Sequence, residues 1–281
     1  GGSWQIKGAI AGKLAGCRVL WHLNDTKIPG IIRAFFGPVA GLCASGFIVA
    51  GQRVKNYYLE DSKLGVRKPV FEIQAPVDCN YFDPQNINPD ESISEIEAIK
   101  IASVGNVSPI KGFEYFLSMA EILSKKNKDL HFFIVGPHWK SQQNYSKKLE
   151  QIKTAKGLHN LTFYGSSLDV RKIYKATDIY VCTSVAEASP NAVWEAMAMQ
   201  KPIVATDVGD ISRFLTHGEN AYIVPSGDSE ELAYYVGKLA QDPKLREHFG
   251  KKARLKALEN LDISKVAKQH FEVYRGIFKN K

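Results

Sequence analysis

The sequence predicts an α/β protein with one complete doubly wound, Rossmann-like domain preceded by an incomplete domain of the same kind. From residue 98 onward, short apolar runs alternate with amphipathic helical segments, and the first 84 residues show the same alternation in fewer copies. Near-continuous apolar strands separated by helices are typical of parallel sheets that are covered on both faces. A polar segment rich in Pro, Asn, Asp and Ser separates the two regions and predicts a linker over residues 85–97.

The predicted first domain, residues 1–84, contains strands at 17–23, 46–51 and 69–73 and helices at 5–15 and 28–43. Three strands form a thin sheet, so we expect an unpaired edge and an uncovered apolar face near Val19, Ile48 and Phe71. A partner chain that completes the domain, or a homo-oligomer formed through that edge, would cover both.

The predicted second domain covers residues 98–262. Its strands are the runs at 101–105, 131–136, 161–165, 178–182, 202–206 and 221–224. A last helical segment, residues 263–281, carries Val266, Phe271, Val273, Tyr274 and Phe278 on its apolar side, and we expect this side to pack back on the N-terminal part.

Charge, cysteine spacing and the distribution of hydrophobic residues favour some classes of function over others. A formal charge of +8 favours anionic partners, but no basic stripe interleaved with aromatic residues is present, so we expect no nucleic acid partner. The four cysteines, which are widely spaced, predict neither a zinc site nor a disulfide framework and fit a cytoplasmic protein. The most hydrophobic stretch, residues 28–51, is interrupted by Arg33, Pro38 and glycines, which favours a helix and a buried strand over a membrane span and leaves peripheral contact with the inner face of a membrane open.

The segment that follows the strand at 178–182 predicts an anion site. A loop carries Glu187, and Ser189 and Pro190 then open a helix, since Ser suits the N-cap and Pro the first helical position. In open parallel sheets, ligands bind beyond the carboxyl ends of the strands, where helix N-termini present free N–H groups to anions. The loop from Glu187 to Asn191 is therefore a candidate phosphate-binding loop.

Glu195 lies in the same helix among apolar residues, where an unsatisfied carboxylate costs several kcal/mol. It follows Glu187 by eight residues, so both carboxylates can border one crevice and accept hydrogen bonds from hydroxyl groups beside a diphosphate. Such a ligand is a nucleotide sugar. From the spacing alone, two other interpretations stay open: Glu187 as an acid that complements the helix dipole, and Glu195 as half of a buried ion pair.

A second loop, "GNVSPIKG" at 105–112, joins a strand to a helix and places Lys111 where the helix begins. An ammonium group there adds a positive charge to a second helix N-terminus, which favours anions. The alternative is that Lys111 is simply exposed, since many helices begin with an exposed lysine. The two loops together support an anion site better than either loop alone.

These segments resemble a known family. The stretches "GNVSPIKG", "VGPHWK", "FYGSSLDVRKIYKATDIYVCTSVAEASPNAVWEAMAMQKPIVATDVGDI" and "GENAYIVPSGDSEELA" are similar, in order and spacing, to the donor-binding half of glycosyltransferase family 4. Its members are retaining enzymes with the GT-B fold, and the E-x7-E pair, here Glu187 and Glu195, is their signature. Residues 3–84, including "PVDCNYFDP", resemble the later part of the family's acceptor domain, which implies further strands ahead of residue 1.

The resemblance implies a role for each site residue. Glu195 would bind the ribose hydroxyls, Glu187 would face the donor sugar, and Lys111 with backbone N–H groups around Ser189, Pro190 and Asn191 would hold the diphosphate. Backbone near Gly165 would contact the base. The reaction needs no cofactor and no metal, in agreement with the absence of a D-x-D pair, and the donor would be a UDP- or GDP-linked sugar.

Two positions depart from the family pattern. Asn106 stands where the family commonly has Arg, and Asn24 where it commonly has His, with His22 two residues earlier. Losing one charge-assisted bond to phosphate costs about 1.5–3 kcal/mol, or roughly ten- to a hundredfold in donor affinity or rate. We expect His22 to be a core strand residue and not a substitute for the missing His.

The function expected from the resemblance is that of a retaining hexosyltransferase. It would move a sugar from a nucleotide-diphosphate sugar to a saccharide or lipid-linked acceptor in surface polysaccharide or glycan biosynthesis. The alternative is a non-catalytic nucleotide-sugar-binding subunit or fragment that needs a partner chain for activity.

Overall fold

The computed structural model describes residues 5–24, 26, 30–60 and 68–279. The chain divides into two compact units: Gly1–Pro76 together with Leu261–Lys281 form the first, and Val77–Asn260 form the second. The second unit thus begins ahead of the predicted linker and takes that segment in.

The second unit contains a parallel sheet of six strands in the order β6-β5-β4-β7-β8-β9. The strands are β4 (Ile99–Val104), β5 (Leu130–Val135), β6 (Leu161–Gly165), β7 (Ile179–Cys182), β8 (Ile203–Thr206) and β9 (Tyr222–Val224). From the centre of the sheet, β4, β5 and β6 follow one another toward one edge, and β7, β8 and β9 follow one another toward the other edge. The strand order therefore reverses between the neighbours β4 and β7. This is a doubly wound α/β sheet, as predicted.

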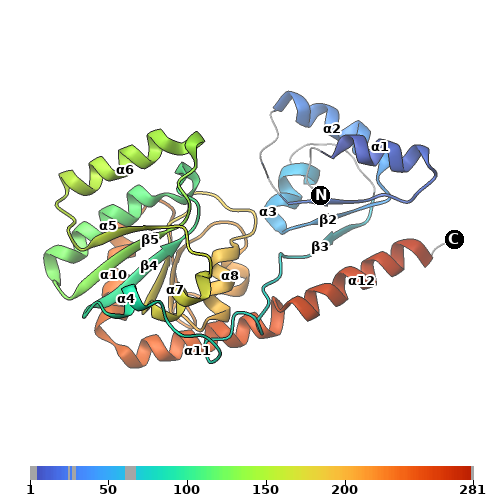
Figure 1. Ribbon diagram of the computed structural model, residues 1–281. Coiled ribbons are helices and arrows are strands. Elements are labelled where there is room, and N and C mark those ends of the chain that lie inside the picture. The colour runs from blue at the N-terminus through green and yellow to red at the C-terminus, as the bar shows by residue number, and fades with distance from the viewer. Residues whose placement is uncertain (1–4, 25, 27–29, 61–67, 280–281) are drawn as a thin grey trace. The chain divides into compact units, whose positions relative to one another are not determined.

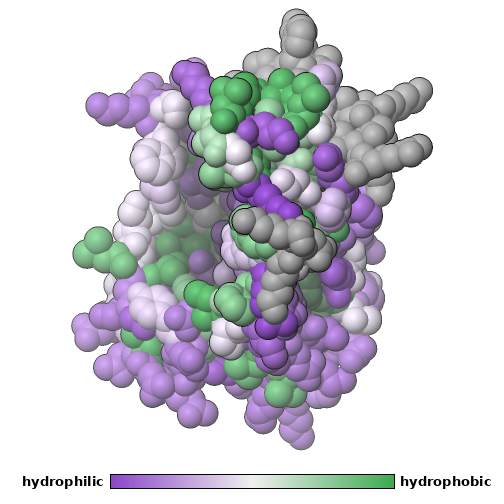
Figure 2. Space-filling model, turned by 90° about the vertical axis from the view of Figure 1, so that its right-hand side faces the viewer, coloured by the Kyte–Doolittle hydropathy of each residue, from purple (hydrophilic) through white to green (hydrophobic). Residues whose placement is uncertain are grey.

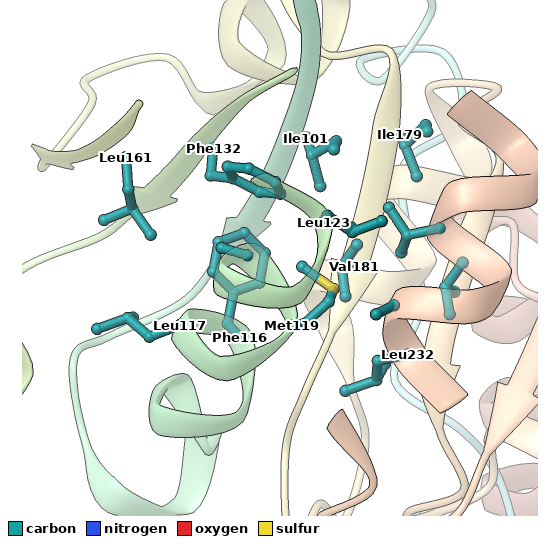
Figure 3. Packing of buried hydrophobic residues seen from close by; sticks show 14 of the residues in the cluster. Ile101, Phe116, Leu117, Met119, Leu123, Phe132, Leu161, Ile179, Val181 and Leu232 are labelled. Atoms are coloured by element: carbon teal, nitrogen blue, oxygen red, sulfur yellow. The ribbon is translucent and has the colours of Figure 1, made fainter. Parts of the chain in front are cut away.

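Helices cover both faces of this sheet (Figure 1). On one face, α5 (Phe113–Lys126) and α10 (Ser229–Gln241) pack on the strands, and Figure 3 shows Phe116 and Leu123 of α5 lying against Phe132 of β5 and Val181 of β7. On the other face, α7 (Val170–Ala176) packs on β4 and β5 through Ile173. The remaining helices of this unit are α6 (Gln143–Ala155), α8 (Asn191–Ala198), α9 (Ile211–Phe214) and α11 (Pro243–Asn260).

The segment expected to be a linker, residues 85–97, contains the short helix α4 (Glu91–Ser94). Asp90 caps this helix by accepting a hydrogen bond from the Ile93 N–H at 3.2 Å, and its other carboxylate oxygen accepts one from Tyr164 at 2.8 Å. Ile93 is fully buried against α7. Burial of this one side chain ties the polar segment to the second unit.

The first unit has a parallel sheet of three strands, β1 (Leu20–Leu23), β2 (Gly46–Val49) and β3 (Val70–Glu72), in that order. Its helices are α1 (Ile6–Leu14), α2 (Gly30–Cys43), α3 (Gln52–Lys55), the π-helical turn Asn56–Glu60 and α12 (Ile263–Lys279). Trp21 of β1 meets Phe36 of α2 with ring centroids 5.0 Å apart. On the opposite face, Val266 of α12 packs on Ile48 and Ile73.

Both faces of this thin sheet are therefore covered by helices of the same chain, and the expected uncovered face is not present among the described residues. The sheet still ends at β1 and at β3, each of which pairs on one side only within the described part of the chain. Exposed apolar residues lie on the helices instead: Leu14 is 83% exposed, Leu42 74% and Phe271 62%. On the face drawn in Figure 2, hydrophobic residues form small groups among hydrophilic ones.

The apolar side expected for residues 263–281 is only partly buried in α12. Val266 packs on the sheet and Val273 is half-buried, whereas Phe271 and Phe278 are mostly exposed. None of the described helices combines the length and apolarity needed to cross a bilayer.

Candidate donor site

The candidate site forms where the order of the six strands reverses. The loops that follow β4 and β7 leave the same edge of the sheet, and two hydrogen bonds join them: the Thr183 hydroxyl donates to the Lys111 carbonyl at 2.9 Å, and the Val185 N–H donates to the Ile110 carbonyl at 2.9 Å. A crevice between such diverging loops is the usual ligand position in doubly wound sheets. The two predicted anion loops therefore meet.

Gly112 allows this close approach. It lies between the 3₁₀ turn Pro109–Lys111 and α5 with φ of 59°, a left-handed conformation that strongly favours glycine. A Cβ at this position would lie 2.3 Å from the Thr183 carbonyl oxygen. The glycine thus lets the loop that carries Lys111 contact the backbone of Thr183, at the end of β7.

Lys111 and Glu187 form an ion pair at this meeting point. The Lys111 Nζ is 2.6 Å from the Glu187 Oε1, and the side chains are 18% and 13% exposed. The Ser184 hydroxyl donates a second hydrogen bond to the same carboxylate oxygen at 2.8 Å. Two of the residues predicted for the donor site are thus in contact with each other, in a largely desolvated position.

The loop that precedes α8 differs from the prediction in one detail. The helix begins at Asn191 with Pro190 as its cap residue, one position later than expected, and no side chain caps it. The Asn191 N–H donates to the Ser189 carbonyl at 2.9 Å, so that N–H is already paired, and the Ser189 hydroxyl accepts from the Trp194 indole at 3.2 Å. Trp194 is fully buried and thereby fixes the course of the loop.

Glu195 has a partner that the sequence did not reveal. Its Oε2 accepts a hydrogen bond from the Tyr174 hydroxyl at 2.9 Å. Burial raises the pKa of Glu195 above its ordinary value, while the hydrogen bond from Tyr174 and the charge of Lys111 act in the opposite direction. Among the described residues, the hydrogen-bond partner of this buried carboxylate is a phenol, and the role of Glu195 toward a ligand stays a prediction.

The other predicted residues lie at the ends of strands. Asn106 is exposed just after β4, and Gly165 ends β6, where its carbonyl accepts the Gly136 N–H at 2.8 Å. In the first unit, Asn24 is exposed, whereas the His22 ring lies 3.0 Å from the Tyr274 hydroxyl and stacks on His270. His22 therefore faces α12 as a strand residue.

Two residues of the site could be recognised only in the structure. From the sequence alone, Tyr174 is an ordinary core residue and Ser184 an ordinary loop serine. Their contacts with Glu195 and Glu187 depend on which strands are neighbours in the sheet. A tyrosine in an apolar helix needs a partner for its hydroxyl, which is the one signal that could have pointed to it. No cluster of three or more His, Cys, Asp or Glu side chains suited to a metal ion occurs in the described ranges.

The fold and the site together define a protein of the doubly wound α/β class, with a cation and two carboxylates on the loops and helix at its switch point. Residues 85–256 match the family described as glycosyl transferases group 1, and the chain belongs to this family.

Relatives of known name support this membership. An uncharacterised glycosyltransferase of Haemophilus influenzae is 29% identical over 198 residues, which cover 69% of this chain and 53% of the relative. The alpha-D-kanosaminyltransferase of Streptomyces kanamyceticus is 27% identical over 177 residues, covering 62% of this chain and 45% of that protein. The chain thus spans about half the length of these relatives.

Solved structures show the same fold. The chain is similar to Anabaena HepE in complex with UDP and glucose, with a TM-score of 0.85 at 23% identity over 97% of this chain and 75% of HepE. It is also similar to sucrose-phosphate synthase from Thermosynechococcus elongatus, with a TM-score of 0.82 at 18% identity over 98% of this chain and 72% of that one. The α/β architecture with two parallel sheets is thus GT-B-like, as predicted.

Proposed function

We propose that this protein is a retaining glycosyltransferase that transfers a hexose from a nucleotide-diphosphate sugar to a saccharide or lipid-linked acceptor. The observation that carries the proposal is the contact of Lys111 with Glu187 at the switch point, eight residues ahead of Glu195 in the chain. A cation and two carboxylates in this arrangement suit the three parts of such a donor: the diphosphate, the sugar and the ribose.

Lys111 is assigned to the leaving diphosphate. Transfer breaks the bond between the sugar and the diphosphate, and negative charge develops on the phosphate oxygens, so a preorganised ammonium stabilises the transition state. The acceptor hydroxyl attacks from the same face of the sugar and gives its proton to a phosphate oxygen. The N-terminal end of α8, with the loop from Ser189 to Asn191, supplies a further partial positive charge.

Glu187 is assigned to the donor sugar. In the free protein its carboxylate is held by Lys111 and Ser184. An incoming diphosphate competes for Lys111 because it carries more charge, and this releases one oxygen of Glu187 to accept from sugar hydroxyls. The ion pair therefore keeps both groups in place until the donor binds.

UDP is the first nucleotide to test. HepE structures contain UDP, UDP-glucose, or UDP with glucose, and their fold is that of this chain. A GDP-linked donor is the second choice. The relatives act on different substrates, among them an alpha-maltose-1-phosphate synthase from Mycolicibacterium smegmatis, and the pathway served here, surface polysaccharide or another glycan, is part of the proposal.

The cellular setting is also proposed. The four cysteines are free thiols, which fits a cytoplasmic protein. A strand from a partner chain or from a second copy would pair with the outer side of β1 or β3, where the sheet of the first unit ends. Residues 98–262 are assigned to donor binding and residues 1–84 to the acceptor side.

Release of free nucleotide from a donor in the presence of acceptor extracts tests the proposal. A glycosyltransferase converts UDP-sugar to UDP faster with an acceptor than with water alone, and it loses this acceptor-dependent turnover in Lys111→Met. A protein that binds the donor and releases no UDP with any saccharide or lipid-linked acceptor is instead the non-catalytic subunit, and addition of a partner chain would then be required for turnover.

A further inference from the structure

Tyr174 is a fully buried residue of α7 whose hydroxyl points at α8. It lies 2.9 Å from the Glu195 Oε2 and 3.0 Å from the Ala192 carbonyl oxygen. A phenol has one proton to donate, so the two acceptors share it. Both acceptors belong to α8, and Tyr174 therefore fixes this helix and its carboxylate together.

Packing holds the Tyr174 side chain in place. Its ring contacts Phe82 with centroids 6.4 Å apart and Tyr180 with centroids 5.8 Å apart, and no part of the side chain is exposed. Packed side chains of this kind occupy one rotamer. A rigid donor therefore selects one orientation of the Glu195 carboxylate and engages only one of its two oxygens.

The charged and titratable groups around Glu195 are few. Lys111 acts on it as a cation, and it is itself paired with Glu187. Burial raises the pKa of Tyr174 and of Tyr180 well above the ordinary value, and it also raises the pKa of the Cys182 thiol, so these three groups are neutral near pH 7. Tyr174 is the hydrogen-bond donor that opposes the effect of burial on Glu195.

We propose that Tyr174 is a positioning residue for ribose recognition: it holds Oε2 of Glu195 so that Oε1 accepts from the ribose hydroxyls of the nucleotide. An ionised carboxylate can accept several hydrogen bonds, so the contact with Tyr174 leaves the capacity that a vicinal diol requires. A site built to hydrogen-bond hydroxyls discriminates strongly against an analogue that lacks them. The ribose assignment rests on the proposed function, whereas the contact itself is a property of the free protein.

The free protein tests the coupling without any ligand. Burial makes the folded-state pKa of Glu195 higher than the unfolded one, so the folded protein binds an extra proton between the two values, and the free energy of unfolding falls as pH rises through that window. Tyr174→Phe removes the opposing hydrogen bond and raises the folded-state pKa further. Its destabilisation should therefore be larger at pH 7 than at pH 4, and this pH dependence should vanish in a Glu195→Gln background. Parallel pH profiles of wild type and Tyr174→Phe would overturn the inference.

Titration calorimetry with UDP and 2′,3′-dideoxy-UDP then tests the ribose role. We expect Tyr174→Phe to bind UDP about tenfold more weakly and dideoxy-UDP within about twofold of wild type. Tyr180→Phe is the matched control, because Tyr180 is buried beside Tyr174, and it should change UDP affinity by less than about twofold.

Different outcomes would contradict the role of Tyr174 and the proposed function. Equal losses of affinity for UDP and dideoxy-UDP in Tyr174→Phe would show a general structural effect and overturn the inference alone. A wild-type protein that binds neither UDP nor GDP would overturn the proposed function and the ribose role with it.

Discussion

Disruption of the Lys111–Glu187 pair should cost the folded protein a measurable free energy. The charged atoms are 2.6 Å apart, and with an effective dielectric constant of about 20 their attraction is roughly 6 kcal/mol. Desolvation of the two ions consumes most of this attraction, because each side chain is less than one-fifth exposed. A net coupling of about 1.5–3 kcal/mol remains, the range of hydrogen bonds between charged groups.

The assay is a double-mutant cycle by urea unfolding with Lys111→Met, Glu187→Gln and the double variant. Lys148 and Glu114 provide the matched control, since their charged atoms are 3.7 Å apart and Lys148 is 58% exposed. We expect less than about 1 kcal/mol of coupling for this longer and more exposed pair. A coupling below about 0.5 kcal/mol for Lys111 and Glu187 would refute the reasoning, because it would show that the pair does not form in solution.

Further predictions concern binding and folding. Glu195→Ala should weaken nucleotide binding more than Glu187→Ala, which should mainly remove discrimination between nucleotide and nucleotide sugar; equal UDP affinity of wild type and Glu195→Ala in calorimetry would contradict the ribose assignment. Asn106→Arg should strengthen diphosphate binding about tenfold at low salt, and an unchanged affinity would place Asn106 away from the phosphates. Gly112→Ala should destabilise the fold by at least about 2 kcal/mol, because its Cβ would collide with a strand-end carbonyl. Gly157→Ala, with a similar φ of 60° and open space around it, should cost about 1–2 kcal/mol in the same unfolding assay.

The sequence predicted the fold of the second unit well because each strand there is a short, nearly continuous apolar run. It missed α4, since a four-residue helix in a polar segment has no detectable period and is held by one buried residue, Ile93. The start of α8 was misplaced by one residue because Ser189 and Pro190 have the preferred cap chemistry, while Trp194 draws the serine hydroxyl into a different hydrogen bond.

The sequence predicted the residues of the site but not which of them contact one another. The loops of Lys111 and Glu187 could be identified separately from their neighbours in the chain, but their contact depends on β4 lying beside β7. The partner of Glu195 could not be predicted either, because Tyr174 lies on a different helix, 21 residues earlier. In the first unit, an uncovered face was expected even though residues 263–281 were predicted to pack back on this part of the chain. That expectation failed because Val266 of α12 packs on Ile48 and Ile73 and covers the face.

Titration calorimetry of the purified protein with UDP-, GDP- and ADP-glucose tests the central claim most directly, namely that the cluster at the switch point binds a nucleotide sugar. The account predicts saturable one-to-one binding of UDP- or GDP-glucose by wild type and its loss in Lys111→Met, with the two unligated proteins folded alike by circular dichroism. Binding of the sugar nucleotide with equal affinity to wild type and Lys111→Met, or no binding of any of the three, would contradict it.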